Sequence, residues 1–385
     1  MSVKNTLNNI TIEDSTIKSK TGLSHFKSIY KKHSNFSKNT IDIESTSDSF
    51  NSSEIINFDI DTVGDLLLNI TLYVELTSEI EVTNFNIVNE ILYALIDSIS
   101  IKCNNKIIQT FTGYWIYIWH QLNGSNKNQY ILDSCSLLES NNNKNLYRLH
   151  LPIPFWFSSC PDKALPLLSL QNEKISIELK LIDFKKISKN NKIFIKNIKL
   201  ICDYIDLDND EKTNYINNSL EYVIEQIEHT SKLINKDTSS FKKIEIPRYA
   251  FVNELIWIFV NLDLDFENYF NFWKDNKNLS EDHSKSVTIL LNGKPIQSKL
   301  KSSYYRKIQN YQNHSKNILK NCIYSYSFGL YSDEIKPAGI LSLNKYNMAL
   351  LEMQILASSK ERLLYLFIKK FNIIRIKDGY LHLLV

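Results

Sequence analysis

Apolar and polar residues alternate with a period of two through most regular segments of this sequence. Successive side chains of a β-strand point to opposite faces of a sheet, so this alternation predicts strands with one buried face. These segments are also rich in Ile, Tyr, Phe and Val, which favour strands. They cover residues 66–76, 99–107, 175–181, 193–204, 287–291, 324–330 and 363–367. The sequence therefore predicts an all-β protein with few, short helices.

Two short turn signals indicate that neighbouring strands run antiparallel. Asn104-Asn105 stands between residues 99–103 and 106–108, and Asn292-Gly293 stands between residues 289–291 and 295–297. Two-residue hairpin turns require positive φ, which Asn and Gly adopt more readily than other residues. We expect both pairs to close β-hairpins.

Length and charge exclude several classes of protein. A chain of 385 residues with 43% hydrophobic residues is long enough for one large or two medium packed domains. A formal net charge of +3 gives no sustained positive field, which argues against packaging nucleic acid by bulk charge. The first 20 residues are polar and the apolar runs are short, so we expect no signal peptide and no membrane span. Five cysteines without a CxxC pair predict reduced thiols.

The acidic run at residues 206–211 has two interpretations. Its alternating aspartates resemble the start of a calcium-binding EF-hand loop, but Glu211 replaces the required Gly and Asn217 the bidentate Glu. The alternative is a capping box, in which Asp208 is the N-cap residue and Glu211 follows three residues later. We favour the capping box, which predicts a short helix ending near Ile216.

That helix and the polar stretch at 230–240 divide the chain into two β-rich halves, which predicts two β-sandwiches in series. The expected division is an N-terminal arm at 1–39, a first β-domain at 40–215, a connection at 216–240 and a second β-domain at 241–385. Internal repetition is too weak at the level of single residues to show a duplication.

Prolines beside aromatic residues mark a candidate core segment. Pro152 and Pro154 cannot donate to a sheet, so they suit the start or end of a strand with Phe155, Trp156 and Phe157 turned inward. An aromatic box that binds a ligand is the alternative. The residues expected to define the core are Pro152, Pro154, Phe155, Trp156, Phe157, Pro166, Trp115, Trp119 and Trp257.

The sequence predicts no catalytic, cofactor or metal site. Its histidines are scattered without metal-ligand spacing, and neither a G-x-S-x-G motif nor a P-loop occurs. The basic aromatic segment at 299–311 has two interpretations. Tyr304, Tyr305 and Arg306 would suit a stacking face for nucleic acid, or a structural role in the second domain, which we favour.

The N-terminal arm combines apolar and basic residues in one short segment. Such a segment can lie on a protein face or on an anionic membrane. Its candidate contact residues are Phe26, Lys27, Tyr30, Lys31, Lys32 and Phe36.

Several blocks, in the same order along nearly the whole chain, resemble the major capsid proteins of nucleocytoplasmic large DNA viruses, the iridovirus, phycodnavirus, asfarvirus and mimivirus-like group. The strongest is LPIPFWFSSCPDKALPLLSL at residues 151–170. Asn292-Gly293 and the aromatic segment at 324–328 are similar to hairpin and strand segments of the second domain in that family. The remaining blocks are at residues 25–36, 64–76, 94–97, 114–119, 203–211, 221–226, 254–257, 311–314 and 337–339.

The resemblance implies two consecutive eight-stranded antiparallel jelly rolls and a non-enzymatic structural protein without cofactors. It implies homotrimers that tile the icosahedral shell of a large double-stranded DNA virus, assembled in the host cytoplasm or viral factory. Implied partners are further copies of the chain, minor capsid and penton proteins, and the internal viral membrane beneath the arm, but no specific nucleic acid. The alternative is a minor capsid subunit or a non-icosahedral membrane scaffold of the same fold, like that of poxviruses.

Overall fold

The computed structural model describes residues 34–46, 50–78, 88, 90–123, 146–188, 193–237, 239–262, 269–274, 281–314, 321–330, 332 and 338–384. Residues 36–385 form one compact unit, separate from residues 1–35. All of the structure below belongs to the larger unit. Among the described helices, none is long and apolar enough to cross a membrane.

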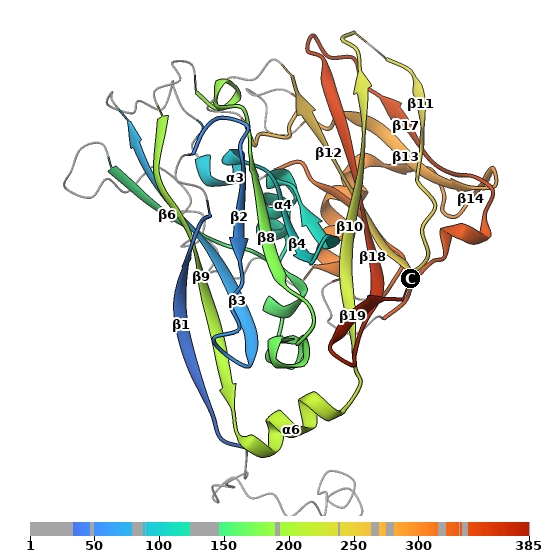
Figure 1. Cartoon of the computed structure of the whole chain (residues 1–385). Helices are drawn as coiled ribbons and strands as arrows, with labels where there is room; N and C mark the ends of the chain where they lie inside the picture. The colour runs from blue at the N-terminus through green and yellow to red at the C-terminus, as the bar shows by residue number, and fades with distance from the viewer. Residues whose placement is uncertain are drawn as a thin grey trace, which may run out of the picture. The chain divides into compact units, whose positions relative to one another are not determined.

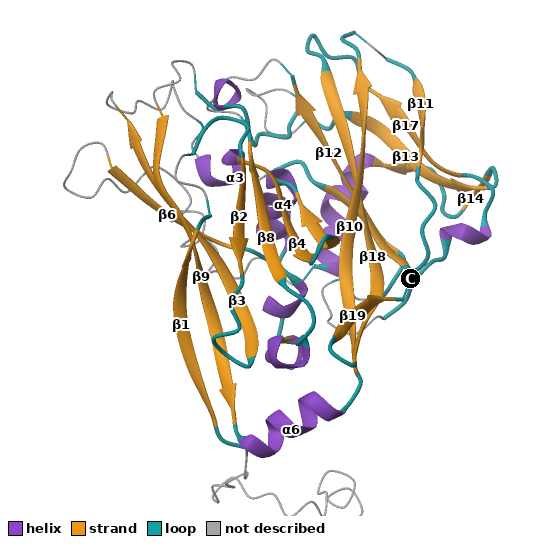
Figure 2. Ribbon diagram, viewed as in Figure 1, coloured by secondary structure: helices purple, strands orange, loops and turns teal. Residues whose placement is uncertain are grey.

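The first half of the larger unit contains two antiparallel sheets (Figures 1 and 2). One has the order β1 (Phe36–Glu44), β9 (Ile193–Leu207), β3 (Leu66–Ser78) and β6 (Leu146–Pro152), with the short β7 (Leu165–Pro166) also paired to β3. The other has the order β2 (Ile55–Asp59), β8 (Ile175–Leu181), β4 (Ile96–Cys103) and β5 (Lys106–Phe111).

The second half repeats this arrangement. One sheet has the order β10 (Leu220–Ile234), β18 (Arg362–Lys377), β12 (Val252–Asn261) and β16 (Tyr324–Ser327), with β19 (Tyr380–Leu383) paired to β18. The other has the order β11 (Phe241–Glu245), β17 (Ala349–Ile355), β13 (Ser284–Leu291) and β14 (Lys294–Pro295), with β15 (Leu300–Lys301) paired to β13.

Both halves have the strand order of a jelly roll. If the short strands β7, β15 and β19 are left aside, the described strands of each half number eight. In each half the first, eighth, third and sixth form one sheet, and the second, seventh, fourth and fifth form the other. This strand order confirms the predicted double jelly roll. It also shows that the two halves repeat one fold, although their similarity residue by residue was too weak to show it.

Helices are short and lie between strands. They are α3 (Ile91–Leu95), α4 (Gly113–Leu122), α6 (Asn209–Asn217), α7 (Asn310–Asn313), the π-helical turn η6 (Tyr304–Gln309) and the 3-10 turns η1 (Trp156–Ser158), η2 (Pro161–Lys163), η3 (Leu167–Ser169), η4 (Phe184–Lys186) and η7 (Leu343–Lys345). Helix α6 joins β9 to β10 (Figure 1). Its N-cap is Asp208, which confirms the predicted start of the helix, but the Asp208 side chain accepts the backbone N–H of Asn209 and not that of Glu211 as a capping box requires.

Both predicted hairpins are present. Asn104 has a φ of 51° between β4 and β5, while Asn292 and Gly293 have φ values of 49° and 78° between β13 and β14. The described cysteines, Cys103, Cys160, Cys202 and Cys322, are free thiols as expected, and Cys135 lies outside the described residues.

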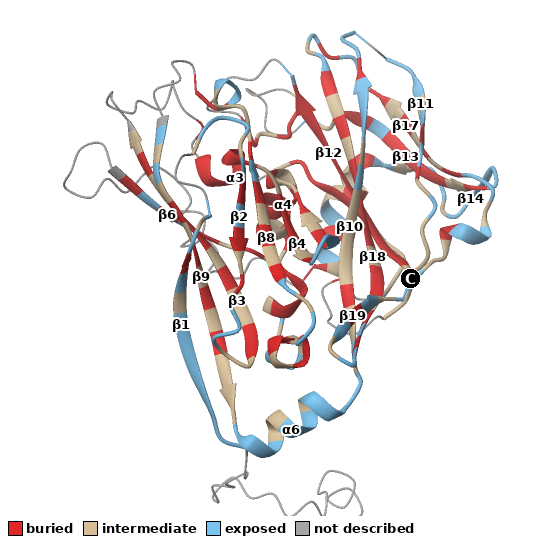
Figure 3. Ribbon diagram, in the orientation of Figure 1, coloured by how far each residue is buried: buried red, intermediate tan, exposed pale blue. Residues whose placement is uncertain are grey.

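Two strands lie where the sequence suggested other structure. Residues 220–234, expected in the connection, form β10, and the last residues of the expected arm, from Phe36 on, begin β1. The two strands lack the alternation of a strand with one buried face, for different reasons. Almost every residue of β1 is exposed on both faces of the strand (Figure 3), while acidic residues of β10 pair with basic residues of β18.

Candidate functional site between the two rolls

The two rolls meet where β5 lies beside β10. Gln109 of β5 donates through Nε2 to the backbone oxygen of Glu225, and Gln226 of β10 donates through Nε2 to the backbone oxygen of Ile108 at 2.6 Å. Asn372 of β18 donates to Oε1 of Gln226 at 3.0 Å. This reciprocal exchange pairs two strands that are edges of their own sheets, and it fixes how one roll is placed against the other.

A second inter-roll contact involves the hairpin of β18 and β19. The Glu173 carboxylate of the first roll accepts the backbone N–H of Leu381 at 2.6 Å and the Cys103 thiol at 2.9 Å. Asn172 Nδ2 donates to the backbone oxygen of Asp378 at 3.3 Å. Burial is the main cause that raises the pKa of the Cys103 thiol, followed by the hydrogen bond to Glu173, so the thiol remains protonated as a donor.

Aromatic side chains form the third contact. Tyr117 of α4 stacks on Phe270 with ring centroids 4.3 Å apart, and Tyr114 stacks on Tyr269 at 5.7 Å. Tyr114 also lies 5.4 Å from Tyr365 of β18. Burial raises the pKa of Tyr114 well above its usual value, and Tyr269 contributes in the same direction. These buried and half-buried rings join the first roll to the second without charge.

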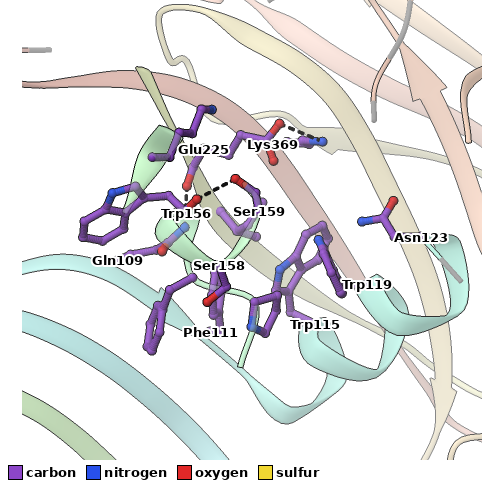
Figure 4. A pocket seen from close by; sticks show the side chains of 14 residues that line it. Gln109, Phe111, Trp115, Trp119, Asn123, Trp156, Ser158, Ser159, Glu225 and Lys369 are labelled. Carbon is purple, nitrogen blue, oxygen red and sulfur yellow. Dashed lines mark hydrogen bonds and ion pairs between the residues drawn. The ribbon is translucent and has the colours of Figure 1, made fainter. Parts of the chain in front are cut away.

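A cavity of about 100 Å³ lies at the same junction (Figure 4). The first roll lines it through β5, α4, η1 and η2, and the second roll lines it through β10 and β18. Its aromatic lining is Phe111, Trp115, Trp119, Phe155 and Trp156. Its polar lining is Gln109, Asn123, Ser158, Ser159, Lys163, Glu225 and Lys369.

Helix α4 brings two of the tryptophans to the cavity. Trp115 and Trp119 are four residues apart, so they share one face of the helix. The helix begins after Thr112, whose Oγ1 accepts the N–H of Trp115 at 3.2 Å. Gly113 follows because a Cβ at this position would lie only 2.1 Å from the backbone oxygen of Tyr93. The close approach of α4 to α3 therefore sets the direction of both indoles.

The proline-flanked segment forms the opposite wall. Pro152 ends β6, and after Pro154 the chain turns into η1. The Phe155 ring stacks on that of Phe157 with centroids 5.6 Å apart, and Trp156 packs edge-on against Phe157 at 5.0 Å. Phe155 and Trp156 are buried and also line the cavity, and the alternative of a ligand-binding aromatic box stays a prediction.

The polar groups of the cavity differ in how they are paired. Lys369 Nζ lies 3.1 Å from Glu225 Oε1 and donates to the backbone oxygen of Ser332 at 2.6 Å. Burial lowers the pKa of the Lys163 ammonium, an effect that the Glu225 carboxylate opposes. Gln109 Oε1 and Ser158 Oγ are buried and have no hydrogen-bond partner within the described part of the protein. Charged side chains therefore stand at a cavity whose other walls are largely aromatic. Over the described ranges, no cluster of His, Cys, Asp and Glu is arranged to hold a metal ion.

Comparisons with known proteins give the family. A family model described as the major capsid protein N-terminus matches residues 24–226, more than half of the chain, and one described as the large eukaryotic DNA virus major capsid protein matches residues 211–381. The chain belongs to this major capsid protein family. The predicted resemblance is thereby confirmed.

Individual relatives extend the similarity over nearly the whole chain of this capsid-family protein. The major capsid protein of Pyramimonas orientalis virus is 24% identical, covering 93% of this chain and 92% of its own. That of Paramecium bursaria Chlorella virus 1 is 22% identical, covering 86% and 82%. The solved VP54 structure from PBCV-1 has a TM-score of 0.82 at 19% identity, covering 94% of this chain and 100% of its own. The Faustovirus major capsid protein has a TM-score of 0.76 at 10% identity, covering 95% and 94%.

The structure places the other predicted core residues of this capsid-family chain as follows. Trp257 is fully buried in β12 and stacks on Tyr324 with centroids 5.7 Å apart. Trp115 is buried and Trp119 half-buried, and Pro166 is buried in β7. Pro152 and Pro154 are half-buried.

Of the predicted arm residues, only one lies within the described structure. Phe36 is the first residue of β1, where it pairs with Leu207, and its side chain is 59% exposed. Phe26, Lys27, Tyr30, Lys31 and Lys32 lie outside the described residues, so their contact role remains a prediction.

The basic aromatic segment of this capsid-family chain is largely used inside the second roll. Tyr305 is fully buried and donates to the backbone oxygen of Val287 at 3.0 Å. Arg306 pairs with Asp282 at 2.9 Å and lies over the Trp273 ring at 4.6 Å. The alternative of a nucleic-acid stacking face is therefore wrong for Tyr305 and Arg306, because buried packing occupies both side chains.

Sequence reasoning missed the polar residues of the junction. The available signal was a polar side chain within a strand whose other residues are apolar or are charged and at the surface. Gln109, Gln226 and Lys369 are such side chains. Their role depends on which strands of the two rolls lie side by side. A local sequence pattern carries no information about that contact.

Proposed function

We propose that this chain is a shell-forming subunit that assembles as a homotrimer, and that these trimers tile an icosahedral capsid. Membership of the family makes the chain a structural protein of the virion capsid. The observation that supports the trimer is the repeated strand order in two rolls held together by buried contacts. Two similar rolls in each chain give six around a threefold axis, and six-sided blocks fill a lattice.

We also assign the segment before β1 to contacts below the shell. Its basic and apolar residues at 26–32 suit a minor capsid protein or an anionic membrane, with each basic residue adding on the order of 1 kcal/mol at the lipid surface. The start of β1 at Phe36 supports treating the preceding residues as separate from the roll, as does the division of the chain at residue 35.

Light scattering on the purified chain tests the trimer. We expect a particle of three times 45.0 kDa, and lattices or shells by electron microscopy. A monomer at micromolar concentration would contradict the proposal. Trimers that coat membranes without closing into shells would favour the alternative of a membrane scaffold.

Two deletions test the N-terminal segment. Removing residues 1–35 leaves β1 intact, so we expect a normal trimer that floats poorly with anionic liposomes and forms fewer shells. Removing residues 1–44 is the matched comparison, because it also deletes β1, which pairs with β9 from Phe36 to Glu44. Loss of the trimer in the shorter deletion would show that the segment belongs to the folded subunit.

A further inference from the structure

We propose that the helical segment at 302–313 of one copy of the chain packs on the outer face of β1 and β9 of a second copy. Within one chain, α4 of the first roll already makes such a contact with β10 and β18 of the second roll, where the Trp115 and Phe367 rings lie 5.5 Å apart. The proposal rests on the homotrimer and names the two surfaces that join each copy to the next.

The strand registers align the sheet of the first roll with that of the second. Near its start, the third strand of each roll has a register irregularity against the eighth strand, directly before Asn69 in β3 and directly before Glu254 in β12. Asn69 pairs with Asp203 in the first roll. Glu254 pairs with Lys369 in the second. Asp203 therefore occupies in the first roll the position that Lys369 occupies in the second.

An ion pair stands at the aligned positions of both rolls, with its charges exchanged. Lys369 Nζ lies 3.1 Å from Glu225 Oε1 in the second roll, where the pair lines the cavity beneath the first roll. Lys38 Nζ lies 2.9 Å from Asp203 Oδ2 in the first roll. Lys38 and Glu225 are aligned because each pairs with the residue two positions after the aligned residue of the eighth strand. Both side chains of the first-roll pair are more exposed than their counterparts.

Strand β1 lacks the cover that its counterpart β10 has. Seven of the nine residues of β1 are exposed, whereas eight of the fifteen residues of β10 are half-buried (Figure 3). In β10, Glu225 and Ile227 face the first roll across the cavity (Figure 4). Strand β1 is also the edge of its sheet, and an uncovered edge strand is a surface to which another chain can bind.

The helical segment at 302–313 is the counterpart of α4. Ile99 in β4 and Val287 in β13 stand at the same place, the second residue after a register irregularity against the seventh strand. Their partners in the hairpin strand that follows are Phe111 and Leu300. In each roll a helix begins two residues after that partner. The two helices therefore hold the same position in their rolls.

These two helices differ in how far they are covered. All ten residues of α4 are buried or half-buried, because the second roll lies against it. In the segment at 302–313, Ile308 is 44% exposed and Tyr311 84% exposed, and Lys307 beside them is exposed too. Counted from the start of each helix, Ile308 is the counterpart of Trp119, which lines the cavity opposite β10. Neighbouring exposed apolar side chains mark an interaction surface.

Charge favours a contact between this helix and β1. Residues 299–311 include four basic residues and no acidic residue. Strand β1 and residues 199–207 of β9 together include four acidic and two basic residues. Opposite charge favours the helix of one copy against the sheet of another and disfavours helix against helix. A contact between two different surfaces of the same chain can close three copies into a ring.

A charge placed in the proposed contact tests the helix surface. Sedimentation of the full-length protein over a dilution series measures how readily the trimer dissociates. Ile308→Glu should raise the concentration at which half of the trimers dissociate roughly tenfold or more. Ile55→Glu is the matched control, because it makes the same change at a side chain of β2 that is 48% exposed, and it should leave dissociation unchanged. Thermal unfolding of each variant checks that the fold is intact.

Thr40→Lys tests the opposite surface. Thr40 is aligned with Ile227, and Ile227 lines the same cavity as Trp119, so Ile308 of one copy should face Thr40 of the next. Thr40→Lys alone should also weaken the trimer because it adds positive charge opposite a basic helix. Combined in one chain, Thr40→Lys and Ile308→Glu bring opposite charges together and should recover most of the lost association. Two changes that only disturbed each roll would not compensate each other.

The wild-type mass separates this proposal from the homotrimer itself. A wild-type monomer would refute both. A wild-type trimer that neither single change weakens, or that the double variant fails to restore, would overturn the assigned surfaces alone and leave them to a different partner.

Discussion

Mild acid should destabilise this protein through a buried histidine of the second roll. His283 is fully buried, and its ring stacks on Phe259 with centroids 4.5 Å apart. Nε2 donates to the backbone oxygen of Phe272 at 2.9 Å, which leaves Nδ1 to accept from Arg362 Nη1 at 3.3 Å. Burial, and then the Arg362 guanidinium, lower the pKa of His283 to about 3.

The sign of the effect follows from that lowered pKa. An unfolded histidine titrates near 6.5, so below that pH the unfolded chain binds a proton that folded His283 refuses. The stability is fully present above pH 6.5 and is lost as the pH falls toward 3, by about 1.4 kcal/mol per pH unit. Burial likewise lowers the pKa of His120 to about 4. At pH 5 each histidine costs about 2 kcal/mol, a large share of a typical stability of about 5–15 kcal/mol.

Urea unfolding at pH 7.5 and pH 5.0, at one protein concentration, measures this loss. His283→Gln keeps a donor for Phe272 and an acceptor for Arg362 but cannot be protonated. We expect its loss of unfolding free energy between the two pH values to be about 2 kcal/mol smaller than that of the wild type. His382→Gln, at an exposed position, is the control and should behave as the wild type. An equal loss in wild type and His283→Gln would refute the reasoning.

Three further substitutions test the packing around the junction. Trp156→Ala should destabilise the first roll by roughly 3 to 5 kcal/mol because the side chain is 5% exposed, and an unchanged denaturation midpoint would contradict this. Gly113→Ala should lower the thermal midpoint, because the new Cβ would lie 2.1 Å from the backbone oxygen of Tyr93, and a midpoint equal to the wild type would show that α4 can shift freely. Glu173→Ala leaves the N–H of Leu381 without its partner and should cost about 1 to 3 kcal/mol in urea unfolding, with no cost if water replaces the carboxylate.

The fold was predictable from sequence where strands have one buried face. In β8 the burial alternates residue by residue, and the same alternation is visible in its sequence. Prediction from alternation fails for β1, which is exposed on both faces. It also fails for β10, whose acidic residues form ion pairs with basic residues of β18. In β12 alternation is also missing, because all ten residues are buried and residues 255–260 are a continuous apolar run. Alternation is visible in a sequence only where one face of a strand is buried and the other is exposed. In β1, β10 and β12 the two faces differ little in burial.

The candidate site was predictable only in part. Its aromatic wall at 155–156 was recognisable because prolines flank it. The reciprocal glutamines were not, since the hydrogen bond from Gln109 to Glu225 joins residues 116 positions apart. The side chains that complete the cavity come from a different roll, and their position depends on packing that forms only after both rolls exist.

The pairing of first and last strands in each roll has a consequence for the folding rate. Phe36 of β1 pairs with Leu207 of β9, and Leu220 of β10 pairs with Ile376 of β18. Contacts between residues so distant in sequence require closure of a long loop before they yield any stability, and proteins dominated by them fold slowly. During synthesis the first roll can close once Leu207 has left the ribosome, while β10 must wait for β18 as an unpaired edge. That interval is when the chain is most prone to aggregate, so a chaperone that covers β10 would improve the yield of folded subunits, whereas slower elongation would lengthen the interval and lower the yield.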